Sequence, residues 1–150
     1  MTVMRMVDVT SKERTVRAAA AAGAVQTTEA VVAAIAEGRT QKGDVLAAAR
    51  LAAIMAAKKT PDLVPLCHPI AIGGVDVELE LGTDRVDIAV RVKTCDRTGV
   101  EMEALTAVCA AGLTVIDMIK GEDPDASIEH VRVLAKAGGK TGMWERSPKR

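Results

Sequence analysis

Residues 75–92, V-D-V-E-L-E-L-G-T-D-R-V-D-I-A-V-R-V, alternate apolar and polar side chains on both sides of the turn G-T-D. Alternation with a period of two predicts two half-buried strands, and the short turn predicts that they pair as a hairpin. An antiparallel sheet is therefore expected at the centre of the fold.

Three segments around the hairpin are predicted to be helices. Residues 100–120 resemble one long helix that ends at Gly121, and their apolar content predicts nearly complete burial. A short helix is expected to begin at the capping residues 27–29 and to run through Ala36. Asp44 can begin another helix through the alanine-rich stretch that follows it.

The remaining segments complete the expected fold. Residues 15–26 are ambiguous, because alanine favours a helix whereas valine and the interrupting glycine favour a strand, and a strand is the preferred interpretation. The three prolines within 60–69 predict an extended, irregular loop with no room for a helix. Residues 128–136 predict a final strand. This order indicates an α+β fold of the split β-α-β kind, a mainly antiparallel sheet with helices on one face.

Length and composition indicate how the core is built. The chain of 150 residues is expected to be a single domain, 1–150, with flexible ends at 1–5 and 143–150. Hydrophobic residues make up 49% of the sequence, yet Trp144 is the only aromatic one. Small aliphatic side chains must therefore fill the core, and they favour close packing of the backbone.

Charge and cysteine content exclude several classes of function. Twenty basic residues balance twenty acidic ones, and a single aromatic residue offers no stacking surface, so no nucleic-acid partner is expected. The charged N-terminal residues exclude a signal peptide, and no uninterrupted apolar run is long enough for a membrane span. The scattered Cys67, Cys95 and Cys109 suit a reducing compartment. A cytoplasmic protein without a membrane partner is expected.

Cys67 and His68 lie between Pro65 and Pro69, which would hold a functional side chain in a fixed position. A buried thiol beside a structural histidine is the alternative interpretation. A Cys–His nucleophile is disfavoured, because adjacent residues normally point apart. No metal site is expected either, since His130 is the only other histidine and the cysteines lack C-x-x-C spacing.

Residues 135–142, A-K-A-G-G-K-T-G, contain the G-K-T of a nucleotide-binding P-loop. The P-loop pattern fails, because Leu134 stands where its first glycine is required, five positions before Gly139. The backbone N–H groups near Gly139, with Lys136 and Lys140, could still hold phosphate oxygens. The alternative is a flexible terminal segment.

The predicted long helix carries Glu101, Glu103, Asp117 and Lys120 among apolar neighbours. Burying an ionised carboxylate without a partner is unfavourable by on the order of several kcal/mol, so such groups need a partner, a shifted pKa or a water-filled pocket. Asp117 and Lys120 could simply form a surface pair, and the two glutamates could simply complement the helix dipole.

The spacing of these charges constrains any common function. Glu103 and Asp117 are expected to lie about 21 Å apart along the helix axis and about 40° apart around it. One small substrate cannot touch both carboxylates on a single helix. Either there are two sites, or a second, antiparallel copy of the helix brings opposite ends together, which predicts a symmetric oligomer with sites between subunits.

Five motifs together resemble the MoaC family of cyclic pyranopterin monophosphate synthases. They are M-V-D-V-T-S-K at 6–12, K-G-D-V at 42–45, P-L-C-H-P at 65–69, the helix at 99–120, and L-A-K-A-G-G-K-T-G at 134–142. The resemblance implies a ferredoxin-like α+β fold and a role in molybdenum cofactor biosynthesis. It also implies a homohexamer, a trimer of dimers, with active sites at subunit interfaces.

The resemblance further implies a reaction, that of a phosphorus–oxygen lyase. The substrate would be the cyclised GTP derivative (8S)-3′,8-cyclo-7,8-dihydroguanosine 5′-triphosphate. It would be converted to cyclic pyranopterin monophosphate with release of pyrophosphate, with no cofactor or metal required. A non-catalytic, ferredoxin-like nucleotide or metabolite sensor is the alternative, and a zinc-type GTP cyclohydrolase is disfavoured for lack of a ligand set.

Residues that match the family motifs take their expected roles from it. Asp117, Lys42 and Lys120 are expected to be catalytic, Leu66, Cys67, His68, Met102 and Glu103 to bind substrate, and Asp8, Arg17, Glu101, Lys136 and Lys140 to be further pocket residues.

Overall fold

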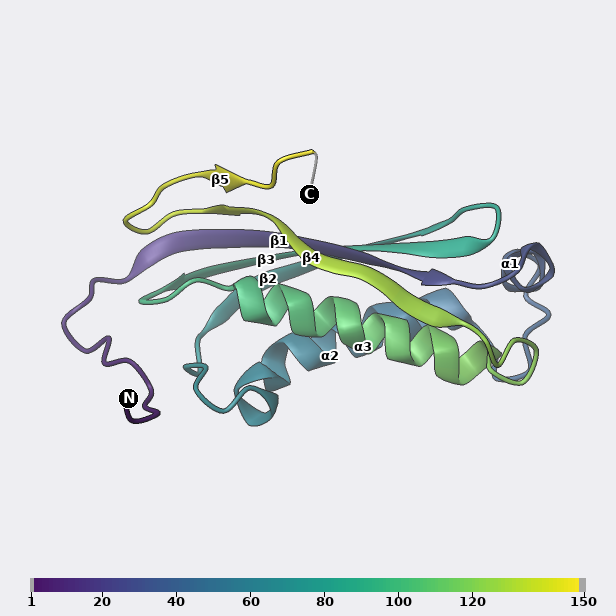
Figure 1. Cartoon of the computed structure of the whole chain (residues 1–150), viewed down its shortest axis with the longest axis horizontal. Coiled ribbons are helices and arrows are strands. Elements are labelled where there is room, and N and C mark those ends of the chain that lie inside the picture. Colours follow the sequence, from purple (N-terminus) through teal and green to yellow (C-terminus); the bar gives the residue numbers. More distant parts are fainter. Residues whose placement is uncertain (1, 149–150) are drawn as a thin grey trace.

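The computed structural model describes residues 2–148, which form one five-stranded sheet accompanied by three helices (Figure 1). The elements are β1 Thr15–Gln26, α1 Glu29–Ala36, α2 Val45–Leu63, β2 Ile72–Leu81, β3 Arg85–Asp96, α3 Glu101–Ile119, β4 Ser127–Ala137 and β5 Trp144–Glu145. The strand order is β2-β3-β1-β4-β5, and every neighbouring pair is antiparallel. Helices α2 and α3 lie on one face of the sheet. The units β1–α2–β2 and β3–α3–β4 are two split β-α-β units, which confirms the α+β, ferredoxin-like fold.

The hairpin predicted at 75–92 is the pair β2–β3, with Val77 opposite Val90. The predicted helix starts are also confirmed. The Thr28 hydroxyl and the Asp44 carboxylate each accept a hydrogen bond from the backbone N–H three residues ahead, at 3.2 Å and 3.0 Å. These caps satisfy N–H groups that have no partner inside the helix, and they set where α1 and α2 begin.

The alanine-rich segment 15–26 is the central strand β1, hydrogen-bonded to β3 on one side and to β4 on the other. Ala19, Ala21 and Val25 point into the core and are at most 2% exposed. A Cβ atom at Gly23 would lie only 2.9 Å from Cγ1 of Val108 on α3. Pairing on both sides therefore overrides the helix preference of alanine, and the small side chains let α3 approach closely.

The prediction that α3 is almost completely buried was wrong. One face of the helix, including Ala107, Val108 and Ala111, is buried in the core. Met102 and Leu113 are 40% and 62% exposed, because the sheet and α2 cover only part of the helix circumference. By length and composition alone α3 could span a membrane, but half of that stretch is buried inside the protein, as in a core helix.

The prediction of a helix-free segment over 60–69 was wrong at its start, because α2 continues through Pro61 to Leu63. Proline has no N–H to donate to the carbonyl of Ala57, four residues earlier. The hydroxyl of Thr60 donates to that carbonyl at 3.0 Å instead. Residues 64–71 do run without helix or strand.

Two further features were not predicted. The short strand β5 pairs with β4, within the segment 143–150 that was expected to be a flexible end. Residues 1 and 149–150, which belong to the expected flexible ends, lie outside the described residues. The second feature is a β-bulge in β4 around His130, whose φ of 57° is left-handed.

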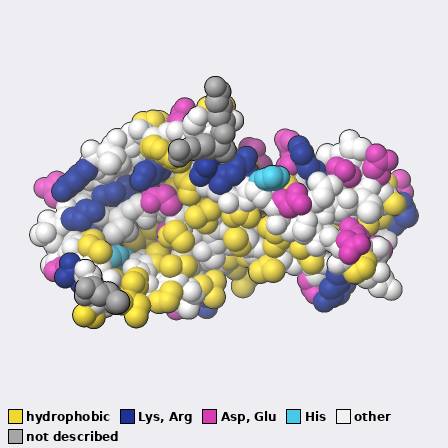
Figure 2. Space-filling view, in the orientation of Figure 1, with side chains coloured by type: hydrophobic (Ala, Val, Ile, Leu, Met, Phe, Trp, Pro, Cys, Tyr) yellow, Lys and Arg dark blue, Asp and Glu magenta, His cyan; other side chains and the backbone are white. Residues whose placement is uncertain are grey.

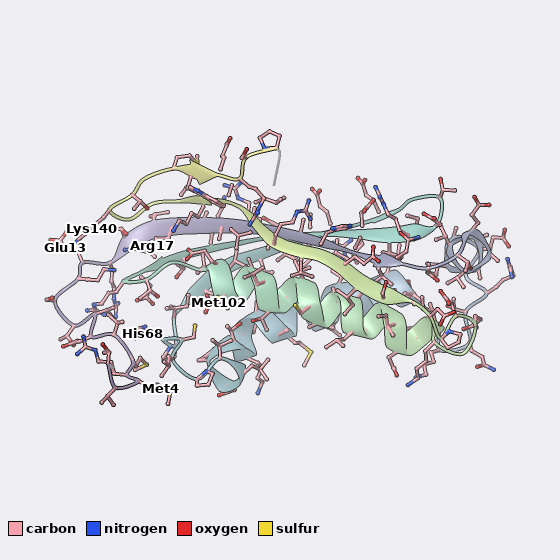
Figure 3. All side chains as sticks on the ribbon, viewed as in Figure 1. Met4, Glu13, Arg17, His68, Met102 and Lys140 are labelled. Atoms are coloured by element: carbon pink, nitrogen blue, oxygen red, sulfur yellow. The ribbon has the colours of Figure 1, made fainter. Side chains whose placement is uncertain are left out.

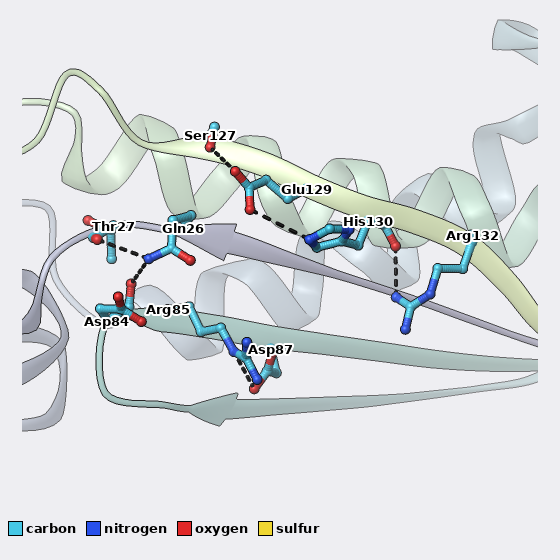
Figure 4. Close-up of polar contacts among 9 residues, drawn as sticks. All are labelled: Gln26, Thr27, Asp84, Arg85, Asp87, Ser127, Glu129, His130 and Arg132. Atoms are coloured by element: carbon cyan, nitrogen blue, oxygen red, sulfur yellow. Dashed lines mark hydrogen bonds and ion pairs between the residues drawn. The ribbon is translucent and has the colours of Figure 1, made fainter. Parts of the chain in front are cut away.

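Figure 4 shows this bulge with its polar contacts. Arg132 Nη1 donates to the His130 carbonyl at 2.7 Å, and Glu129 Oε2 lies 3.8 Å from the imidazole Nε2. The Ser127 hydroxyl donates to the other carboxylate oxygen of Glu129, Oε1, at 3.1 Å. A bulge bends its strand and increases the local twist, so β4 does not run straight over α3.

Thr60→Val is expected to lower the free energy of unfolding by about 1–3 kcal/mol, because it leaves the Ala57 carbonyl without a donor in the core. Thr114→Val on α3 is the matched control. The Thr114 hydroxyl donates to the Ala110 carbonyl at 2.8 Å, but that carbonyl also accepts the helical backbone N–H, so the loss is expected to stay below about 0.5 kcal/mol. Urea unfolding measures both losses, and equal losses would contradict the proposed role of Thr60.

Candidate active site

Asp117 holds two lysines at the C-terminal end of α3. Its Oδ2 accepts a hydrogen bond from Lys42 Nζ and its Oδ1 one from Lys120 Nζ, both at 2.9 Å. Lys42 comes from the loop between α1 and α2, and Lys120 directly follows α3. The hydrogen bonds from Lys42 and then Lys120 lower the pKa of Asp117 to about 2. The carboxylate is therefore ionised at neutral pH, and all three side chains are about half exposed.

This arrangement allows a bound anion to change the basicity of Asp117. A carboxylate with an ammonium group on each oxygen is a weak base. Phosphate oxygens are alternative partners for the same ammonium groups. A phosphorylated ligand that draws away Lys42 or Lys120 would raise the pKa of Asp117 and free an oxygen to accept a proton.

Glu103 and Cys67 meet at the other end of α3. The Cys67 thiol donates to Glu103 Oε2 at 3.5 Å, and the glutamate is only 1% exposed. Glu103 Oε1 is buried and has no hydrogen-bond partner within residues 2–148. Burial raises the pKa of Glu103, and the nearby charge of Glu101 raises it further. Glu103 is thus a buried acid with one unused oxygen.

The Cys67 thiol is not an activated nucleophile. Burial, and then the charge of Glu103, raise its pKa to about 11, so the thiol is protonated at neutral pH. Its side chain lies against Glu103 instead of the imidazole of His68. The disfavoured Cys–His pair of the sequence analysis therefore has no support in the geometry.

His68 and Met102 lie at the same end of the molecule, close to the N-terminal segment (Figure 3). His68 Nε2 lies 2.6 Å from the backbone carbonyl oxygen of Val7. Met102 and Leu66 are 40% and 45% exposed. Figure 2 shows a hollow at this end of the molecule, with Lys and Arg side chains along its upper rim. The predicted substrate-binding residues thus come together at the N-terminal end of α3.

An arginine pocket of about 190 Å³ adjoins this end. It is lined by Arg17, Glu101 and Lys136, with Ala137, Gly138 and Thr141 closing one side. Arg17 donates to the carbonyl oxygens of Asp96 at 3.2 Å and of Arg97 at 3.3 Å, which fixes its guanidinium group.

Two glycines shape the wall of this pocket. Gly138 and Gly139 have φ values of 92° and 74°, and a Cβ atom on them would collide with the Val16 carbonyl and the Arg17 guanidinium. Lys140 lies near Arg17 in Figure 3. Glycine is therefore required at both positions, and the turn that they form lies against Arg17.

The structure separates the predicted site residues into two groups. Lys42, Asp117 and Lys120 form one group, and the residues around His68 and Glu103 form the other. A separation of 14 residues on one helix corresponds to about 21 Å. Asp8 is exposed, and its carboxylate accepts hydrogen bonds from the backbone N–H and the hydroxyl of Thr10, at 2.8 Å and 2.5 Å.

The arginine pocket is also lined by Gly99 and Thr141, which were not among the predicted site residues. Both are loop residues of common types, and only the predicted phosphate-binding turn nearby hinted at Thr141. Among residues 2–148 there is no group of three or more His, Cys, Asp or Glu side chains that could hold a metal ion.

A comparison with known protein families matches residues 6–139 to the MoaC family. The chain belongs to the MoaC family. The match covers both groups of site residues except Lys140, which directly follows the matched range. It begins in the N-terminal segment beside His68 and ends at the glycine turn beside Arg17.

Curated relatives extend this result over most of the chain. A protein of Streptomyces griseus named cyclic pyranopterin monophosphate synthase is 56% identical over 143 residues, which cover 95% of this chain and 81% of the relative. A Mycobacterium tuberculosis protein named cyclic pyranopterin monophosphate synthase 2 is 55% identical over 141 residues, covering 94% and 84%. A synthase of the same name from Pelobacter propionicus is 51% identical over 143 residues, covering 94% and 89%.

Glu103→Gln should make stability less dependent on pH. Because the pKa of Glu103 is raised on folding, its favourable contribution is complete below its ordinary pKa of 4.5 and is lost as pH rises toward the raised value. Glutamine resembles the protonated acid, so the stability of the variant relative to wild type should increase from about pH 4.5 to pH 7.

Asp117→Asn is the matched control for this measurement. Its pKa is lowered from 3.8 to about 2, so its contribution is lost only as pH falls through that range. The difference in stability between Asp117→Asn and wild type should therefore stay constant between about pH 4.5 and pH 7. Urea unfolding at several pH values measures the stability of both variants. A difference between Glu103→Gln and wild type that does not change with pH would contradict a pKa of Glu103 raised by burial.

Proposed function

We propose that this chain is a cyclic pyranopterin monophosphate synthase, a lyase of molybdenum cofactor biosynthesis. It would convert (8S)-3′,8-cyclo-7,8-dihydroguanosine 5′-triphosphate to cyclic pyranopterin monophosphate and pyrophosphate. The proposal rests above all on one observation: a family member identical at about half of its positions to named synthases carries Asp117 between two lysines. A sensor would have no need for a carboxylate whose basicity depends on bound phosphate, so the non-catalytic alternative is not favoured.

The side chains suit the chemistry of this conversion. Forming the cyclic phosphate requires a sugar hydroxyl to attack phosphorus, so that one P–O bond forms while the P–O bond to pyrophosphate breaks. Lys42 and Lys120 would neutralise the charge on the departing pyrophosphate. Asp117, once released by a lysine, would take up a proton during the rearrangement of the ring system. Glu103, His68 and the arginine pocket would hold the rest of the substrate.

The distance between the two groups supports an oligomer with shared sites. Figure 2 shows hydrophobic side chains across the middle of the face on which α3 lies in Figure 1. Met102 and Leu113 are exposed on this helix, and Leu105 and Ile116 are half-buried. An antiparallel α3 from a second copy would cover these side chains and bring its Asp117 toward Glu103. Each site would then use both subunits, in a homohexamer built as a trimer of dimers.

The whole of 1–150 would act as a single domain of the MoaC kind, since its described helices pack on one sheet. The protein would work in the cytoplasm, where its three free cysteines stay reduced.

Asp117→Asn and Lys120→Ala should each reduce pyrophosphate release from the cyclised GTP substrate by about 10²-fold or more. Glu37→Gln is the control, because it removes an exposed ion pair with Arg39 (2.5 Å) outside both groups of site residues. The control should keep its activity, and all variants should stay folded with a cooperative unfolding transition. Tight substrate binding by wild type without pyrophosphate release would contradict the synthase and favour the sensor.

Subunit mixing tests whether a site uses two chains. Asp117→Asn and His68→Ala are each expected to be inactive, but co-expression in one cell should restore activity to about one quarter of wild type. In a mixed dimer, one site receives both altered residues and the other receives neither. Co-expressing Asp117→Asn with Lys120→Ala is the control, because these residues share one chain's cluster and no site would be restored. No recovery in the first mixture would show that each subunit forms its own site.

A further inference from the structure

The N-terminal arm, residues 2–14, contains no helix or strand, yet it is attached to the body of the protein by specific polar contacts. The Val7 carbonyl oxygen lies 2.6 Å from His68 Nε2. Farther along the arm, Arg97 Nε donates to the Lys12 carbonyl at 3.1 Å. The arm is therefore fixed at His68 and again five residues later.

The turn at Asp8 strengthens this attachment. Its carboxylate accepts both the backbone N–H and the hydroxyl of Thr10, which holds the backbone directly after Val7 in one conformation. These hydrogen bonds from Thr10 lower the pKa of Asp8, and the charge of His68 lowers it further.

Hydrophobic burial does not hold the arm in place. Val3, Met4 and Val7 are 84%, 78% and 65% exposed, and residues 2–14 contribute nothing to the buried core. The polar contacts to His68 and Arg97 therefore determine its path. The arm can be shortened without removing any core side chain.

The contact with Val7 determines the protonation pattern of His68. A carbonyl oxygen can only accept a hydrogen bond, so the imidazole must carry its hydrogen on Nε2. In the neutral ring the other nitrogen, Nδ1, is then the only acceptor. Without this carbonyl, the arm would favour neither neutral tautomer of His68.

We propose that the N-terminal arm is a positioning element of the active site, in which the Val7 carbonyl holds His68 in the Nε2–H tautomer and leaves Nδ1 as the acceptor available to substrate. The role of Nδ1 toward substrate rests on the proposed function, because only that proposal places substrate beside His68. The hold of the arm on His68 is a property of the free protein and can be measured without substrate.

Histidine ¹⁵N spectra of the full chain test the tautomer directly, since His68 and His130 are the only histidines. The measurement is made near pH 8, where an ordinary imidazole is almost entirely neutral. His130→Asn identifies the second set of signals, and asparagine tolerates the left-handed backbone of that position. His68 should show a protonated Nε2 and an unprotonated Nδ1. An unprotonated Nε2 would overturn the proposal.

Two deletions separate the contact from the rest of the arm. Deleting residues 2–9 removes the Val7 carbonyl, whereas deleting residues 2–5 keeps it. The longer deletion should give a mixture of His68 tautomers and lower kcat by about tenfold or more with KM changed less than about threefold, because the loss is one of orientation. The shorter deletion should leave the tautomer and kcat unchanged.

Asp8→Asn in the full chain controls for the carboxylate that the longer deletion also removes, and its tautomer should stay Nε2–H. A deletion of 2–9 that keeps both the tautomer and the rate would overturn the proposal. If the tautomer changes as expected but wild type releases no pyrophosphate, the hold of the arm on His68 is supported and only the proposed function is contradicted.

Discussion

The close approach of α3 to the strands β1 and β4 is the constraint on which the rest of the structure depends. A Cβ atom at Gly23 would lie 2.9 Å from Val108, and one at Gly112 would lie 3.1 Å from Ile128. Side chains larger than glycine at these points would push the helix off the sheet. The position of α3 is thereby fixed, and with it the positions of the charged residues at both of its ends.

The two ends of this helix give carboxylates opposite properties. Asp117 lies about half exposed between two lysines, and its pKa falls to about 2. Glu103 is 1% exposed with a thiol as its polar neighbour, and its pKa rises. The side chains differ by one methylene group, so the environment makes the difference: paired positive charge favours the ionised form, and burial favours the neutral form. One helix therefore carries a carboxyl group with a lowered pKa at one end and one with a raised pKa at the other.

Local chemistry allowed much of the fold to be predicted from the sequence. The alternation over 75–92 gave the hairpin, and the capping residues Thr28 and Asp44 gave two helix starts. Predictions failed where a distant or compensating contact decides. Proline normally ends a helix, but the Thr60 hydroxyl satisfies the carbonyl that Pro61 leaves unpaired. The exposed face of α3 was missed because composition alone does not show which side the sheet covers.

The candidate site shows the same limit. The pair Asp117–Lys120 follows from helical spacing, whereas its third member, Lys42, lies 75 residues away and entered only through the family resemblance. The carbonyl of Val7 is a backbone atom, so no residue type at position 7 could indicate its contact with His68.

Under the proposed function, these contacts explain why a single subunit should catalyse the reaction poorly. The Asp117 carboxylate is paired with lysines of its own chain, and the buried Glu103 lies about 21 Å away from it along the helix. Phosphate from substrate, and a helix end from a second copy, would each remove one of these obstacles. The basicity of Asp117 would then appear only where substrate and both subunits are present, which would protect a reactive ring system from proton transfer before the leaving group is in place.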